Sequence, residues 1–141
     1  MRQSRANERR RGRELALQAL YASTQTDAAP TLALEQLPGW DLASETAREF
    51  AEQLIQRLQI HGTEIDRVLE SVLHHWDTDR IARVDDCIIR LASCELISCP
   101  DIPSAVSINE GIELAKKYST EQSGRFVNGI LDAISAQTLA G

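Results

Sequence analysis

The chain has 141 residues and a formal net charge of −6, with 43% hydrophobic and 26% charged residues. This length accommodates one domain with a substantial core, and leaves no room for a second, catalytic domain. No apolar run approaches the roughly 18 to 20 residues of a membrane span, and the N-terminus lacks the apolar segment of a secretory signal. We therefore expect a soluble cytoplasmic protein with no membrane partner.

Positive charge is concentrated at the N-terminus. The first 13 residues contain six arginines and one acidic residue, whereas the rest of the chain contains nine basic and 20 acidic residues. Helical geometry places one polar set on the same side of this segment: Arg10, Arg11, Glu14, Gln18 and Tyr21. A cationic stripe with an aromatic ring suits a phosphate backbone with unstacked bases. The alternative is a solvated helix start behind a disordered basic leader, which is the usual explanation of a charge run.

The hydrophobic periodicity along the chain is helical, and no segment has the alternation of a long strand. We predict helices over residues 8–24, 44–62, 63–76 and 79–98, then one from 104 or 107 to about 117, and a last one from 119–121 onwards. A short helical turn is expected at 31–37, and residues 1–7 are expected to be a flexible basic leader. The predicted fold class is all-α, a compact bundle of six or seven helices in a single domain over residues 1–141.

Three local features predict details of these helices. Thr63 with Asp66 has the spacing of a capping box at a helix start. Ser107 with Glu110 has the same spacing, although that helix could begin as early as Ser104. Gly129 lies inside the last helix, where we expect a close approach of another helix to explain it.

Residues that could carry catalysis or bind metal make no recognisable site. Cys87, Cys94 and Cys99 match no metal-ligand spacing, and an odd number of cysteines agrees with a reducing compartment. The three histidines, at 61, 74 and 75, read as residues near helix ends. No phosphate-cradling glycine loop or nucleophile motif is present, and Asp85-Asp86 reads as solvated helix surface. The sequence therefore favours a binding protein that is not an enzyme and has no catalytic residue, metal site or cofactor.

Four blocks of sequence, taken together, resemble the NusB family of bacterial transcription antitermination factors. They are RRRGRELALQALY at residues 9–21, RLASCEL at 90–96, SINEGIELAKKY at 107–118 and RFVNGILD at 125–132. Residues 25–77 resemble the family in helical pattern alone. The resemblance implies two three-helix sub-bundles and no catalysis. It also implies binding to boxA-like RNA together with the ribosomal protein NusE, during ribosomal RNA transcription by RNA polymerase.

The resemblance also implies which residues meet each partner. The RNA-facing set is Arg9, Arg10, Arg11, Arg13, Gln18 and Tyr21 on the first helix, with Gln122, Arg125 and Phe126 at the start of the last. The set facing NusE is Asp79 and Asp85. This agrees with elementary chemistry, because arginines neutralise phosphates, aromatic rings stack on splayed bases and amides reach base edges. Phe126 is equally compatible with a role as a core anchor.

Two other functions remain open from the sequence. A helical protein-protein adaptor with a merely solvated basic leader would bind its partner tightly and ignore RNA. An RNA-modifying enzyme is a further alternative, because the module also occurs fused to RNA methyltransferase domains, but the chain is short and lacks a cofactor loop. A homodimer formed through the RNA-facing side is compatible with the resemblance.

Overall fold

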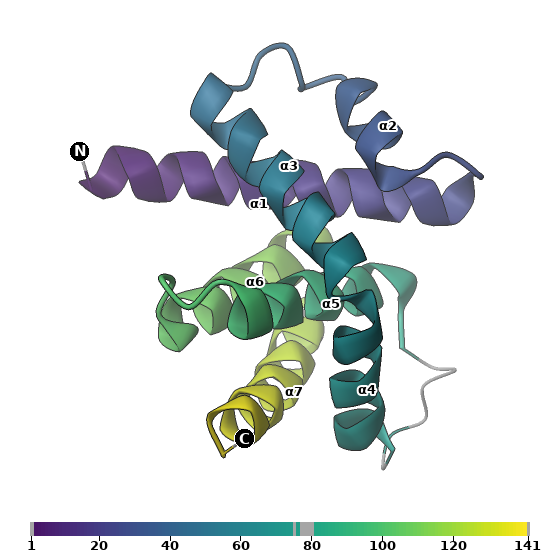
Figure 1. Cartoon of the computed structure of the whole chain (residues 1–141), viewed down its shortest axis with the longest axis vertical. Helices are drawn as coiled ribbons and strands as arrows, with labels where there is room; N and C mark the ends of the chain where they lie inside the picture. The colour runs from purple at the N-terminus through teal and green to yellow at the C-terminus, as the bar shows by residue number, and fades with distance from the viewer. Residues whose placement is uncertain (1, 75, 77–80, 141) are drawn as a thin grey trace. The chain divides into compact units, whose positions relative to one another are not determined.

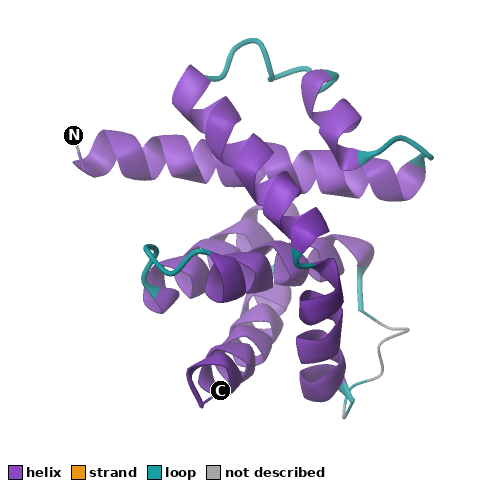
Figure 2. Ribbon diagram, viewed as in Figure 1, coloured by secondary structure: helices purple, strands orange, loops and turns teal. Residues whose placement is uncertain are grey.

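The described residues form helices and no strand, which confirms the predicted all-α fold. The computed structural model describes residues 2–74, 76 and 81–140 (Figure 1). In this part of the chain there are seven helices (Figure 2). None of the described helices is long and apolar enough to cross a membrane. The helices fall into two compact units, Met1–Gln59 and Ile60–Gly141.

The first unit contains α1 (Arg2–Gln25), α2 (Pro30–Glu35) and α3 (Glu45–Ile60). Ala33 and Leu34 are the buried residues of α2, which packs along α1. The helix α3 crosses α1 at Gly12, where an added Cβ would lie 2.8 Å from the carbonyl oxygen of Ala47 (Figure 1). Glycine is needed at this position because any side chain would push the two backbones apart.

The second unit contains α4 (Gly62–Leu73), α5 (Arg83–Ser98), α6 (Ser104–Tyr118) and α7 (Glu121–Ala140). The helices α6 and α7 pair with each other and both pack against α5, while α4 contacts α5 and α7. The helix α5 accordingly buries a wide apolar surface, which includes Ile88, Ile89 and Leu91. An added Cβ at Gly111 would lie 2.8 Å from a methyl carbon of Leu131, so α6 and α7 approach closely there.

Two helix starts differ from the prediction. The helix α1 begins at Arg2, so the segment expected to be a basic leader continues the helix; it contains no proline or glycine that would end one. The helix α5 begins at Arg83 because Ala82 before it is extended, with φ −58° and ψ 142°. The predicted first residue of that helix, Asp79, lies outside the described residues.

Both predicted capping boxes are wrong. The backbone N–H of Ile65 donates to the carbonyl of His61, so α4 already begins at Gly62 and Thr63 lies inside its first turn. Pro103 directly precedes α6, which begins at Ser104. Ser107 is buried one turn later, where its hydroxyl donates to Glu95 Oε1 at 3.0 Å.

The predicted role of Gly129 is also wrong. This residue is exposed, and no neighbouring atom would lie within 4 Å of an added Cβ. The close helix approaches use Gly12 and Gly111 instead, which lie on the buried sides of their helices.

Candidate nucleic-acid interface

A polar stripe runs along one side of α1. Arg10 and Tyr21 are exposed, Tyr21 to 40%, and Arg11 and Gln18 are half-buried. On the opposite side of the helix, residues 12, 16, 19 and 20 are buried. Because the buried side fixes the helix, the side chains of the stripe face solvent from a rigid support.

Arg9 and Arg13 lie elsewhere on α1 and share one aromatic ring. Their guanidinium carbons lie 5.4 Å and 5.2 Å from the centroid of the Phe50 ring on α3. Arg13 is only 3% exposed, whereas Arg9 is half-buried. A guanidinium over an aromatic face is attracted by the ring quadrupole. In this structure Arg13 therefore joins α1 to α3, and it does not reach the exposed stripe.

Arg11 is held in place by two neighbours. Its Nη1 donates to Glu14 Oε1 at 3.3 Å, and its Nη2 lies close to Gly39 in the loop between α2 and α3, where a side chain would collide with it. Glu14 is only 8% exposed, although the helical pattern placed it on the polar side of the helix. The cation of Arg11 is thus positioned before any ligand arrives.

Two of the three predicted residues at the start of α7 line a pocket of the second unit. Gln122 and Arg125 are exposed, and Phe126 is half-buried. The Phe126 ring meets the ring of Trp76 edge to face, with centroids 5.2 Å apart and planes at 78°. Phe126 and Gln122 line a pocket of about 490 Å³ with Trp76, Asp85 and Ser123. Phe126 therefore forms part of the pocket wall. This position is intermediate between the two roles that the sequence allowed, an RNA-facing ring and a core anchor.

Asp85 lines this pocket and is only 5% exposed, so it is not the solvated surface residue that the sequence suggested. Its Oδ2 accepts a hydrogen bond from the Ser123 hydroxyl at 2.9 Å. Within the described part of the chain, its Oδ1 is buried without a hydrogen-bond partner. The other residue predicted to face a protein partner, Asp79, lies outside the described residues.

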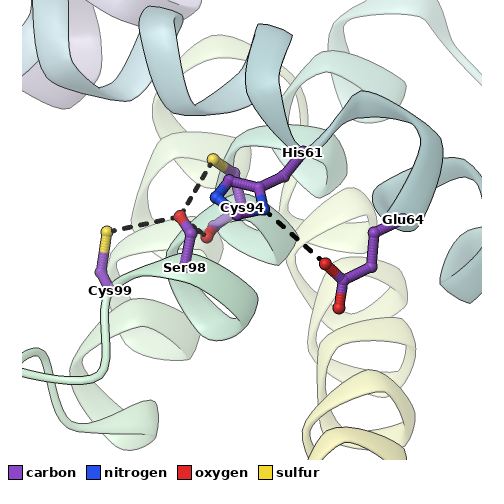
Figure 3. A network of polar contacts seen from close by, with 5 residues as sticks. All are labelled: His61, Glu64, Cys94, Ser98 and Cys99. Carbon is purple, nitrogen blue, oxygen red and sulfur yellow. Dashed lines mark hydrogen bonds and ion pairs between the residues drawn. The ribbon is translucent and has the colours of Figure 1, made fainter.

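The three cysteines are buried. Figure 3 shows the Ser98 hydroxyl between two of them, with the sulfur atoms of Cys94 and Cys99 at 3.6 Å and 3.8 Å. His61 pairs with Glu64 at 3.7 Å in the same view. Among the described residues, no group of three His, Cys, Asp or Glu could hold a metal ion.

A second, larger pocket of about 740 Å³ lies between α4 and the start of α5. Arg90 crosses it, donating from Nη1 to Asp66 at 2.6 Å and from Nε to Asp86 at 3.2 Å. Burial alone would lower the pKa of Arg90, but its hydrogen bonds to Asp66 and Asp86 outweigh burial and raise it. These ion pairs join α4 to α5.

Sequence reasoning missed Phe50, Trp76 and Ser123 as members of the candidate sites. Phe50 and Trp76 could each be an apolar core residue of a predicted helix, so neither gave a separate signal of a site. Ser123 gave only a weak signal of a site, because a threonine before a helix commonly accepts a hydrogen bond from the backbone N–H three residues later. The Thr120 hydroxyl does accept from the Ser123 backbone N–H at 2.9 Å.

The fold and the charge pattern together define a small all-helical protein with a cationic surface helix. The chain belongs to the NusB family, whose model matches residues 10–136. The transcription antitermination protein NusB of Myxococcus xanthus (strain DK1622) is 44% identical over 133 residues, which cover 90% of this chain and 94% of that protein.

Two solved structures have the same fold over nearly the whole chain. T. maritima NusB has a TM-score of 0.82 at 37% identity, and the match covers 92% of this chain and 91% of that one. A structure of the antitermination factors NusB and NusE in complex with dsRNA has a TM-score of 0.82 at 28% identity, covering 93% of this chain and 98% of that one.

Proposed function

We propose that this protein is an antitermination factor that binds boxA-like single-stranded RNA together with the ribosomal protein NusE. It acts in the cytoplasm on nascent transcripts, tethers them to the transcribing RNA polymerase and so supports ribosomal RNA transcription. No step of this function requires catalysis by the protein.

The observation that carries the proposal is the stripe of Arg10, Arg11, Gln18 and Tyr21 on a helix fixed by its other side. Arginine cations attract phosphates at any sequence, whereas an aromatic ring and an amide can distinguish bases that leave the stack. Because the helix that carries these side chains is already fixed, less conformational entropy is lost when they bind RNA. The stripe can therefore give both affinity and some base discrimination.

Two observations support NusE as the partner protein. The relative solved with NusE and dsRNA has the same fold, and the chain outside its first 13 residues is strongly acidic. An acidic surface steers a basic protein towards it and favours its docking. Because few phosphate contacts give weak, salt-sensitive binding, a second RNA-binding protein in the complex adds affinity that one chain lacks.

A mobility-shift experiment with boxA-like and scrambled RNA, with and without NusE, tests the proposal. We expect weak binding by this protein alone, and tighter binding to the boxA-like strand when NusE is present. A tight complex with NusE that ignores both RNAs would show instead that the protein is an adaptor.

A homodimer would change the outcome at high protein concentration. If two copies associate through the α1 stripe, RNA and the second copy compete for one surface. Sedimentation with and without RNA then shows whether RNA dissociates the dimer. A dimer that binds RNA without dissociating would place the RNA elsewhere.

A further inference from the structure

The loop between α2 and α3 lies against the end of the Arg11 side chain. At Gly39, an added Cβ would collide with Arg11 Nη2 and lie 3.6 Å from Arg11 Cζ. The nitrogen thus occupies the space of a methyl group, whereas Cζ is at an ordinary van der Waals distance. Only the outer end of the Arg11 side chain therefore depends on the glycine.

The backbone gives no other reason for glycine at position 39. Gly39 does not have a positive φ, the conformation in which an L side chain is strained. Apart from the adjacent residues, the described atoms within 4 Å of an added Cβ both belong to Arg11. Alanine would therefore fit the loop, and the flexible guanidinium would move instead of the backbone.

Backbone hydrogen bonds and one aromatic ring fix this loop. The N–H of Leu37 donates to the carbonyl of Leu34 at 3.2 Å, and the N–H of Trp40 donates to the carbonyl of Leu37 at 3.0 Å. The next turn is closed by the N–H of Ala43, which donates to the carbonyl of Trp40 at 3.2 Å. On α3, Arg48 Cζ lies 5.9 Å from the centroid of the Trp40 ring. The loop is thus a fixed surface beneath the guanidinium.

Glu14 holds the same guanidinium from within α1. Arg11 Nη1 donates to Glu14 Oε1 at 3.3 Å, so the carboxylate and the loop fix the two outer nitrogens of Arg11 from different elements. A guanidinium has five N–H donors, and the Arg11 side chain remains 37% exposed, so it can still donate to a phosphate. An arginine that is already oriented loses less rotamer entropy when it binds.

We propose that Gly39 is a positioning residue for RNA binding, because its missing side chain lets the loop hold the Arg11 guanidinium in the orientation that meets a phosphate. This inference rests on the proposed RNA-binding function and deepens it. It makes the affinity of the α1 stripe depend on a loop that need not contact RNA itself.

The test is a double-mutant cycle on RNA affinity. Fluorescence anisotropy of labelled boxA-like RNA, with NusE present, measures binding to the full chain, to Gly39→Ala, to Arg11→Ala and to the variant with both changes. Gly39→Ala should weaken binding about two- to tenfold, the cost of ordering one mobile side chain. In the Arg11→Ala background the same substitution should have no effect, because the guanidinium that it displaces is absent.

Arg11→Lys separates the shape of the cation from its charge. A lysine side chain ends at the position of Cζ and has no Nη atoms, so alanine at position 39 should not displace it. Gly39→Ala should therefore leave the affinity of the lysine variant unchanged. Gly62→Ala is the matched control, since an added Cβ there meets no atom within 4 Å and the variant should bind RNA as the original chain does.

Urea denaturation of the same proteins identifies a structural role, and the midpoint of Gly39→Ala should not fall. A loss of affinity that is equal with and without the Arg11 guanidinium, or that comes with a lower midpoint, overturns the positioning role. Unchanged affinity of Gly39→Ala overturns it as well. In each case the effect of Arg11→Ala alone still reports on RNA binding by α1. If the original chain with NusE binds no RNA, both proposals fail.

Discussion

The guanidinium carbon of Arg13 lies 5.2 Å from the centroid of the Phe50 ring, where α3 crosses α1. Arg9 lies over the same ring at 5.4 Å, so one aromatic side chain holds two cations of the arginine-rich segment. Phe50→Leu should lower the free energy of unfolding by about 1–3 kcal/mol, because it removes two cation–π contacts and part of a packed ring. Urea denaturation measures the change.

Phe50→Tyr serves as the control for that variant, because it keeps the ring and should stay close to the original stability. Equal stability of the leucine and tyrosine variants would mean that the ring contributes only apolar volume.

The Arg10→Ala/Arg11→Ala double variant should bind all RNAs more weakly and with less dependence on salt. Losing two phosphate contacts to a single strand should reduce the slope of log affinity against log salt by about 1 to 1.5. The comparison is Lys116→Ala/Lys117→Ala on α6, which removes the same charge. If both double variants have the same slope, net charge explains the effect and the α1 stripe does not.

Tyr21→Ala should reduce the difference in affinity between boxA-like and scrambled RNA. The ring is 40% exposed on the same side of α1 as Arg10, and stacking on one base contributes roughly 1–3 kcal/mol. Tyr21→Phe keeps the stacking surface and should retain the difference. Competition titrations with the two RNAs give both values, and a Tyr21→Ala protein that still discriminates fully would remove this ring from recognition.

Two glycine substitutions should change stability in opposite directions. Gly12→Ala places a methyl group 2.8 Å from a backbone oxygen of α3 and should destabilise the protein by about 1–3 kcal/mol. Gly129→Ala meets no atom within 4 Å and should stabilise it by roughly 1 kcal/mol, since alanine favours the helix. Thermal unfolding of both variants checks the pair, and a stabilised Gly12→Ala protein would contradict the close crossing.

Stability should fall at alkaline pH because of Cys87. Burial, followed by the charge of Asp86, raises the pKa of this thiol from 9.0 to about 11. Between these values the unfolded chain loses the thiol proton and the folded chain keeps it, so ionisation favours unfolding. The contribution is complete below pH 9 and is lost as the pH rises towards 11.

The contribution of Cys87 is isolated by comparison with Cys87→Ala. Denaturation of both proteins at pH 8 and pH 10.5 should show a smaller alkaline loss for the variant, because only the original chain carries this thiol. Equal losses would place the pH dependence on other groups.

Periodicity predicted the existence of the helices because each one buries a stripe at helical spacing. The boundaries of α3 and α4 were close to the predicted ones for this reason. The starts of α4 and α6 could not be predicted so well, because the backbone of the preceding residue decides where a helix starts. His61 and Pro103 have that role, and neither supplies a side-chain hydrogen bond.

The candidate sites were predictable only where one helix determines them. The exposed side of α1 follows from its own sequence, whereas the burial of Arg13 depends on Phe50, 37 positions later. The meeting of Asp85 with Ser123 likewise joins residues 38 positions apart. Such contacts arise from tertiary packing, which residue spacing along one helix does not contain.

The buried hydrogen bond between Glu95 and Ser107 has a consequence for how the sequence can evolve. Both residues are almost fully enclosed, so losing the hydroxyl would deprive a buried carboxylate of a donor. Selection should therefore act on the two positions as a pair. Lineages that replace the carboxylate with an apolar residue become free to lose the serine, whereas those that retain the acid inherit both.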